Sequence, residues 1–160
     1  MEWRRAEAGA MALGMIGESV GPAVRLLRNI LTARIAAAFE PFGLRQGSFS
    51  TLALIGANPG CSQADIVREI AMDKSLVVGI LDDLERRGLA RRERSAEDRR
   101  RNRLFLTDAG AACARDLRDI ADTVEDPIRA ALSPAEMEAL VRLTRRAVDA
   151  LQASEPGAGA

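Results

Sequence analysis

The chain has 160 residues, a length that suits one domain and allows a substantial core to be buried. It carries 23 basic and 23 acidic residues, so its formal charge is zero and bulk charge does not hold it to nucleic acid or membrane. The absence of His excludes a His-based catalytic triad and a His/Cys zinc site. We predict no enzyme activity, metal or cofactor, because no phosphate-cradling glycine loop or convergent set of carboxylates is recognisable.

Cysteine usage and hydropathy indicate the compartment. Cys61 and Cys113 are 52 positions apart, which matches no metal-ligand or redox spacing, so we expect two small buried thiols in a reducing environment. The uncharged stretch 8–17 contains three glycines and is followed by no small-residue cleavage site. No stretch suits a bilayer helix, and the sequence predicts a cytoplasmic protein.

The N-terminal part predicts one long helix. Residues 1–18 show no sustained period, so we expect a loose arm or a short helix there. From about Ser19 to Phe39 apolar residues recur every three or four positions, which predicts a helix that Pro41 and Gly43 end.

Two shorter helices are predicted next. The first runs from about Gln46 to Ala57 and is broken by the sequence Asn58-Pro59-Gly60. The second runs to Ile70, with Ser62 as its N-cap and Asp65 near its positive end. In the first of these helices we expect Phe49, Leu52, Ala53 and Ile55 to face inward.

A fourth helix follows after a short connection. Asp73 is a good N-cap for a helix from Lys74 to about Arg87, and Gly88 supplies its C-terminal stop. Two helices of this length joined by a few residues have the proportions of a helix-turn-helix. The apolar stripe predicted to face inward consists of Leu76, Val77, Ile80, Leu81 and Leu84.

A β-hairpin with unusual charge is predicted after the helix-turn-helix. Leu89 to Arg94 and Arg103 to Leu106 read as two strands, with the polar turn 95–101 between them. Residues 86–103 hold nine arginines and three acidic residues, a local charge of +6, so the other 142 residues sum to −6. An arginine cluster on a hairpin tip beside a helix-turn-helix points to duplex DNA rather than to a merely solvated face.

Two more helices complete the predicted fold. Thr107 caps a helix that runs to a break at Pro127, and Ser133 to Glu136 form a capping box that opens a final helix. Residues 153–160 are small and polar and are predicted to be disordered. The predicted class is therefore mainly α with a small β-hairpin.

Helical geometry selects the candidate groove-facing residues of the helix that begins at Lys74. The helix turns by about 100° per residue. If Leu76, Ile80 and Leu84 face the core, this rotation determines which residues lie on the opposite side of the helix. That side carries Ser75, Val78, Gly79, Asp82 and Arg86.

These side chains suggest separate roles at DNA. Ser75 would reach a base edge or a phosphate, and Val78 would contact a thymine methyl group. Gly79 would let the helix approach closely. Asp82 would accept from a cytosine amino group or orient a neighbouring Arg, and a solvated carboxylate is the equally open alternative.

Several short motifs in fixed order carry a family resemblance. The sequence resembles the MarR (multiple antibiotic resistance regulator) family of winged helix-turn-helix transcription factors over about Val20 to Leu151. The resembling residues are Asp73-Lys74-Ser75, Leu84-Glu85-Arg86-Arg87-Gly88-Leu89, Arg92, Asp98-Arg99-Arg100, Leu106-Thr107 and Gly110.

The resemblance implies a homodimer on a pseudo-palindromic operator. Residues 19–57 and 108–152 would form the dimerisation region, and residues 58–107 the winged DNA-binding region. By this likeness Arg100 enters the minor groove and Asp98 braces the hairpin. The other residues expected at DNA are Ser62 and Gln63 before the recognition helix, Lys74 and Ser75 at its start, and Arg99 and Arg101 on phosphates.

The chain also departs from the family pattern. Leu76, Val78 and Gly79 stand where relatives often carry Thr or Arg, which implies sparse base readout and more reliance on the hairpin, DNA shape and dimer spacing. Leu44 is followed by Arg45, where the family usually has Ser or Thr.

The resemblance further implies release of DNA by a small effector, often an aromatic acid. Arg25, Arg28 and Arg45 are the candidate carboxylate ligands, and the alternative is that they are solvated or pair with acids across the dimer. Three other interpretations stay open. One is a thiol switch at Cys61, whose pKa a helix N-terminus would lower. The others are a non-specific architectural DNA-binding protein and a winged-helix module whose arginine cluster binds an acidic protein instead of DNA.

Overall fold

The computed structural model describes residues 14–70, 72–94 and 102–154. It confirms a mainly helical fold with a small β-hairpin, and the predictions for residues 1–13, 95–101 and 155–160 lie outside the described residues. Two 3₁₀ helices cover Gly14–Glu18 and Glu40–Phe42. The other elements are α1 (Val20–Phe39), α2 (Ser48–Ala57), α3 (Gln63–Ile70), α4 (Lys74–Arg86), β1 (Ala90–Arg94), β2 (Asn102–Leu106), α5 (Asp108–Ala131) and α6 (Pro134–Ala153).

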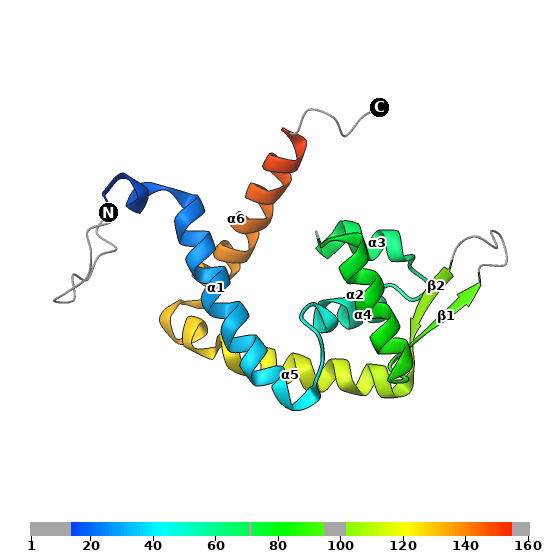
Figure 1. Ribbon diagram of the computed structural model, residues 1–160. Coiled ribbons are helices and arrows are strands. Elements are labelled where there is room, and N and C mark those ends of the chain that lie inside the picture. The colour runs from blue at the N-terminus through cyan, green and yellow to red at the C-terminus, as the bar shows by residue number, and fades with distance from the viewer. Residues whose placement is uncertain (1–13, 71, 95–101, 155–160) are drawn as a thin grey trace.

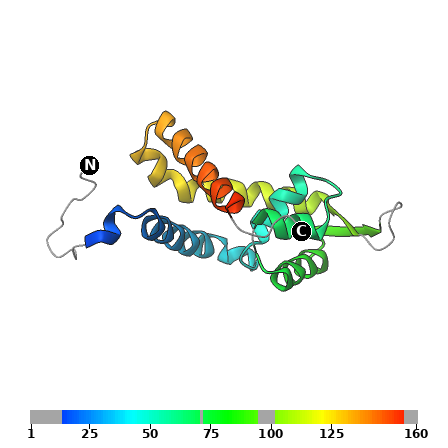
Figure 2. The same cartoon turned by 90° about the horizontal axis from the view of Figure 1, so that it is seen from above.

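The long helix α5 connects the two ends of the molecule. At one end it packs against α2 and β2, beside α3, α4 and the hairpin, and further along it packs against α1 (Figure 1). The view from above places the hairpin at one end and the 3₁₀ helix Gly14–Glu18 at the other (Figure 2). The helices α1 and α6 extend from this body without a fully buried residue of their own.

The core lies in the winged part of the fold. It is built from apolar residues of six elements, and it joins α2, α3, α4, β1, β2 and α5 into one packed unit. Its least exposed large side chains are Leu52, Ile55, Ile66, Val77, Leu81, Leu84, Leu104 and Leu117.

Two predicted core positions are wrong. Leu76 lies in the first turn of α4 and is 56% exposed, because the packed side of that helix begins at Val77. Ala53 is exposed as well, while Ser48 and Thr51 of the same helix are buried. Asp83 of α4 is also buried. The buried sides of these two helices therefore include three polar residues, which the apolar pattern did not predict to lie there.

The hairpin has a third, very short neighbour. Strands β1 and β2 are antiparallel, with Ala90 opposite Leu106 and Arg92 opposite Leu104. Leu104 also exchanges backbone hydrogen bonds with the segment before α3, through its carbonyl to Gly60 N at 2.7 Å and its N–H to Cys61 O at 2.9 Å. This pairing is too short to show the alternation of apolar and polar residues by which a strand is recognised in a sequence. It nevertheless attaches the hairpin to the start of α3.

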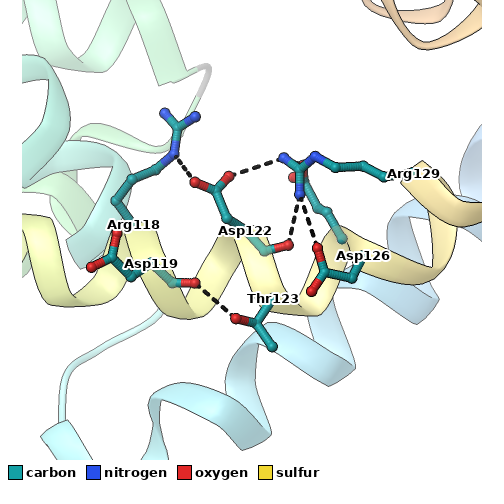
Figure 3. Close-up of polar contacts among 7 residues, drawn as sticks. Arg118, Asp119, Asp122, Thr123, Asp126 and Arg129 are labelled. Atoms are coloured by element: carbon teal, nitrogen blue, oxygen red, sulfur yellow. Dashed lines mark hydrogen bonds and ion pairs between the residues drawn. The ribbon is translucent and has the colours of Figure 1, made fainter. Parts of the chain in front are cut away.

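The predicted break at Pro127 does not occur, because α5 continues through it to Ala131. Proline has no N–H and strains the preceding turn. Arg129 donates to the backbone carbonyl of Asp122 at 2.7 Å and to the carboxylate of Asp122 at 3.0 Å (Figure 3). It also donates to the carboxylate of Glu125 at 3.0 Å. Arg118 holds the other oxygen of Asp122 at 2.9 Å. This chain of contacts bridges the turn on both sides of the proline.

The N-caps predicted for the helices are confirmed. Asp73 accepts from Ser75 N, Thr107 from Gly110 N and Ser133 from Glu136 N, the last within a complete capping box. The start of α3 is closed in the same reciprocal way. Ser62 donates from its N–H and hydroxyl to Asp65 Oδ2 at 2.9 and 2.8 Å, and Asp65 N–H donates to Ser62 Oγ at 3.3 Å.

We predict that Asp65→Asn lowers stability at neutral pH and that the difference from wild type fades in acid. Hydrogen bonds from Ser62, backbone first, lower the pKa of Asp65 to about 2. A carboxylate with a depressed pKa in the folded state contributes stability above its unfolded pKa, near 3.8, and loses it as pH falls toward 2. Urea unfolding of both proteins at several pH values between 2 and 7 measures this.

The control for this prediction is Glu69→Gln, which removes a charge from the same helix outside the cap. Its difference from wild type should show no comparable change between pH 4 and 2. If the deficit of Asp65→Asn were the same at pH 2 as at pH 7, the charged cap would contribute nothing.

Candidate nucleic-acid interface

Helix α4 and the hairpin lie side by side at one end of the molecule (Figure 1). We call the hairpin with its connecting segment, residues 90–106, the wing. Of the predicted groove-facing residues, Ser75, Asp82 and Arg86 are exposed, whereas Val78 and Gly79 are half-buried. Lys74, expected at DNA from the family resemblance, is exposed as well. The first turn of α4 is therefore its most accessible part.

The hydroxyl of Ser75 is already engaged. It donates to Asp73 Oδ1 at 2.5 Å, and the backbone N–H of the same residue donates to that oxygen at 2.7 Å. These two hydrogen bonds lower the pKa of Asp73. Ser75 therefore offers lone pairs to a base amino group without rearrangement, but must leave Asp73 before it can donate to a phosphate.

Asp82 orients an arginine, which is one of the two active roles predicted for it. Arg92 donates to Asp82 Oδ1 at 2.6 Å and to Glu85 Oε2 at 2.9 Å. Arg92 is only 23% exposed, so this pairing is partly shielded from solvent. It joins β1 to α4 and fixes the wing relative to the helix.

The outer face of the wing carries a basic and aromatic cluster that was not among the predicted site residues. The guanidinium carbon of Arg91 lies 4.7 Å from the centre of the Phe105 ring, and that of Arg103 lies 5.7 Å from it. Arg91 also pairs with Glu93. Strand alternation gives the signal that could have found this cluster, because Ala90 and Leu104 occupy the buried face.

The arginines at the end of α4 are tied to the protein. Asp83 is 4% exposed and accepts from Arg86 and from Arg87, the latter at 2.9 Å. Arg87 also donates to the carbonyl oxygens of Phe42 and Gly43. These contacts attach the end of α4 to the segment after α1, and they neutralise part of the basic cluster seen in the sequence.

The remaining predicted DNA contacts stay predictions. Ser62 and Gln63 are half-buried at the start of α3, and the hydroxyl of Ser62 is used in the cap. The predicted contacts Asp98, Arg99, Arg100 and Arg101 lie outside the described residues.

A cavity of about 440 Å³ opens between α1 and the winged part of the fold. Its size is typical of small-molecule sites, and its lining is mostly apolar. Arg45 lines it, whereas Arg25 and Arg28 are exposed on α1 and are not among its lining residues. The lining residues are Leu31, Thr32, Ile35, Ala36, Phe39, Leu44, Arg45, Gln46, Gly47, Phe49, Ser50, Ile70 and Met72.

The environment of Cys61 does not favour a reactive thiolate. Burial, and then the nearby charge of Asp65, raise the pKa of Cys61, although the prediction was a lowered pKa at a helix N-terminus. Burial also raises the pKa of Cys113. The carboxylate of Asp65, which caps α3, thus raises the pKa of Cys61, whereas the helix N-terminus was expected to lower it.

Two features are absent from the described part of the chain. No helix there is both long and apolar enough to cross a membrane. No group of three or more potential metal ligands was found among the same residues.

Comparison with known proteins gives concordant matches. A family model described as MarR family matches residues 42–101. The transcriptional regulator HosA of Escherichia coli O157:H7 is 30% identical over 103 residues, which are 64% of this chain and 76% of HosA. The chain spans 63% of the first curated relative, from Thauera aromatica, and so falls short of two thirds of its length.

Two solved structures extend the likeness over nearly the whole fold. The transcriptional repressor CouR, bound to a 23-mer DNA duplex, has a TM-score of 0.78 and 30% identity, covering 87% of this chain and 99% of CouR. BpsR of Bordetella bronchiseptica, whose DNA binding is regulated by 6-hydroxynicotinic acid, has a TM-score of 0.75 and 26% identity, covering 88% of this chain and 99% of BpsR.

Proposed function

This chain belongs to the MarR family of transcriptional regulators, and on that premise we propose that it is a homodimeric repressor released from its operator by a small aromatic carboxylate. The observation that carries the proposal is the attachment of the wing to the recognition helix α4 through Arg92, Asp82 and Glu85. It would act in the cytoplasm, beside the DNA that it controls.

In this proposal residues 58–107 dock on duplex DNA. The first turn of α4 enters the major groove, where Lys74 and Ser75 are exposed. Arg91 and Arg103 on the outer face of the wing contact phosphates. Arg100 at the wing tip occupies the minor groove, where a narrow groove concentrates negative potential.

The helices in 19–57 and 108–152 form the dimer. Apolar residues along α1 and α6 are 36% to 71% exposed in the single chain, which is more than isolated surface positions explain. A second copy would cover them and place the two wings on neighbouring half-sites. The exposed residues are Val20, Val24, Leu26, Leu27 and Ile30 on α1, and Leu140, Val141, Leu143, Val148 and Leu151 on α6.

The cavity between α1 and the winged part is the proposed effector site. Phe39, Phe49 and Ile70 offer apolar walls to an aromatic ring, and Arg45 offers a bidentate partner to a carboxylate. A molecule held there contacts both the dimerisation helix α1 and the DNA-binding unit, so it favours one relative position of the two. The regulation of BpsR by an aromatic acid supports this choice of ligand.

Gel shifts on duplexes selected from a random pool test the proposed DNA binding. Arg100→Ala should weaken binding of the selected duplex by about tenfold or more, because a minor-groove guanidinium is lost. Arg142→Ala on α6 is the control, since it removes the same charge away from the wing. Equal affinity of wild type and Arg100→Ala would contradict the assignment of the wing.

A further inference from the structure

Arg45 lies beside helix α4 as well as in the lining of the proposed effector cavity. It lies in the loop before α2, and its side chain is exposed. Its Nη1 atom is 3.2 Å from the position that a Cβ atom on Gly79 would occupy. The guanidinium therefore fills the space beside α4 where residue 79 has no side chain.

Gly79 lies on the side of α4 that is opposite to the buried side of the helix. The buried side of α4 is formed by Val77, Ile80, Leu81 and Leu84, and Gly79 lies on the side of the helix turned away from them. Within the described residues, the side chain of Arg45 has neither a hydrogen bond nor an ion pair. Its charge is thus available on the side of α4 that would face DNA.

We propose that Arg45 is a DNA contact, supplied by the loop before α2 across Gly79 to a phosphate at the edge of the major groove. The inference rests on the proposed DNA binding through α4. Helix α4 has no Lys or Arg between Lys74 and Arg86, and in this proposal Arg45 supplies a positive charge on the side of the helix that faces DNA. Since the same side chain lines the cavity, the effector site and the DNA surface share one guanidinium.

A double-mutant cycle of Arg45 and Gly79 tests the proposal, with affinity for the selected duplex measured at several salt concentrations. Arg45→Ala should weaken binding to selected and unrelated duplexes alike, and should lower the salt dependence by about two counterions per dimer. Gly79→Ala places a methyl group against the guanidinium, and the flexible side chain must move. Gly79→Ala should therefore weaken binding alone, but change nothing further when Arg45 is already Ala.

Two results would overturn the proposal while leaving the proposed function intact. One is a wild-type salt dependence in Arg45→Ala. The other is full additivity of the two substitutions, which would mean that a methyl group at residue 79 blocks the approach to DNA without involving Arg45. Failure of the proposed function itself is distinguishable, because wild type would then select no duplex. Melting temperatures establish that the variants are folded, and Arg25→Ala on α1 is the matched control for charge.

Discussion

Gly110→Ala is expected to destabilise the chain by about 3 kcal/mol or more, a large part of the 5–15 kcal/mol that typically stabilises a domain. A Cβ atom at this position would lie 1.8 Å from the carbonyl oxygen of Leu89 and 2.8 Å from its carbon. These are backbone atoms, so the strand entry and the helix start must separate. Thr107 holds the same junction, accepting from Gly110 N at 3.0 Å and donating to Gly88 O at 2.6 Å.

Urea unfolding followed by circular dichroism measures the effect of Gly110→Ala. Gly21→Ala is the matched control, because Gly21 is also helical and a Cβ atom there would meet no atom within 4 Å. That control should change stability by at most about 1 kcal/mol, in the stabilising direction. If the two variants were equally stable, the close packing of α5 on Leu89 would be contradicted.

Leu151→Asp is expected to yield a folded monomer with DNA affinity reduced by about 10² to 10⁴, the usual gain from linking two binding sites. Leu151 is 70% exposed in the single chain, so the protomer does not need it for folding. In the proposed dimer it would be buried, and a carboxylate there would lose its hydration without a partner. Light scattering gives the oligomeric state, and fluorescence anisotropy gives the affinity.

Arg146→Ala controls for charge in this experiment. It lowers the net charge by the same one unit and lies on the far side of the α6 helical wheel from Leu151. It should remain dimeric and keep most of its affinity. A dimeric Leu151→Asp with wild-type affinity would contradict the role proposed for α6.

Local sequence signals predicted most of the fold. Helix starts were found because Ser62, Asp73, Thr107 and Ser133 act within three residues of their partners. The two strands were predicted from the helix stop at Gly88 and from the polar sequence 95–101 between them. Such features depend on neighbours in the chain, so one sequence suffices to recognise them.

The features that were not predicted depend on contacts between residues distant in the chain, or on side-chain hydrogen bonds that stabilise a helical turn containing proline. Pro127 looked like a helix end because Arg129 bridges the proline turn only once the helix has formed. The contact of Arg45 with Gly79 joins segments 34 positions apart. The helical period also placed Leu76 inward, although no neighbouring element covers the first turn of α4 enough to bury it.

The candidate site was partly predictable in the same sense. Ser75, Asp82 and Arg86 are exposed on α4 as helical geometry predicted, although the premise that Leu76 faces inward was wrong. The partners of Arg92 could not be read from the sequence, because Asp82 and Glu85 lie on another element. Of three candidate effector ligands, only Arg45 lines the described cavity, whereas Arg25 and Arg28 are exposed on α1 and are not among its lining residues.

The most direct test of a dimeric, two-winged grip on DNA is the affinity for a selected two-half-site duplex before and after insertion of about five base pairs at its centre. The insertion turns one half-site by about half a helical turn, to the opposite side of the duplex. We predict one dimer per original duplex and a loss of about 100-fold or more after insertion. Unchanged affinity for the lengthened duplex would contradict the account.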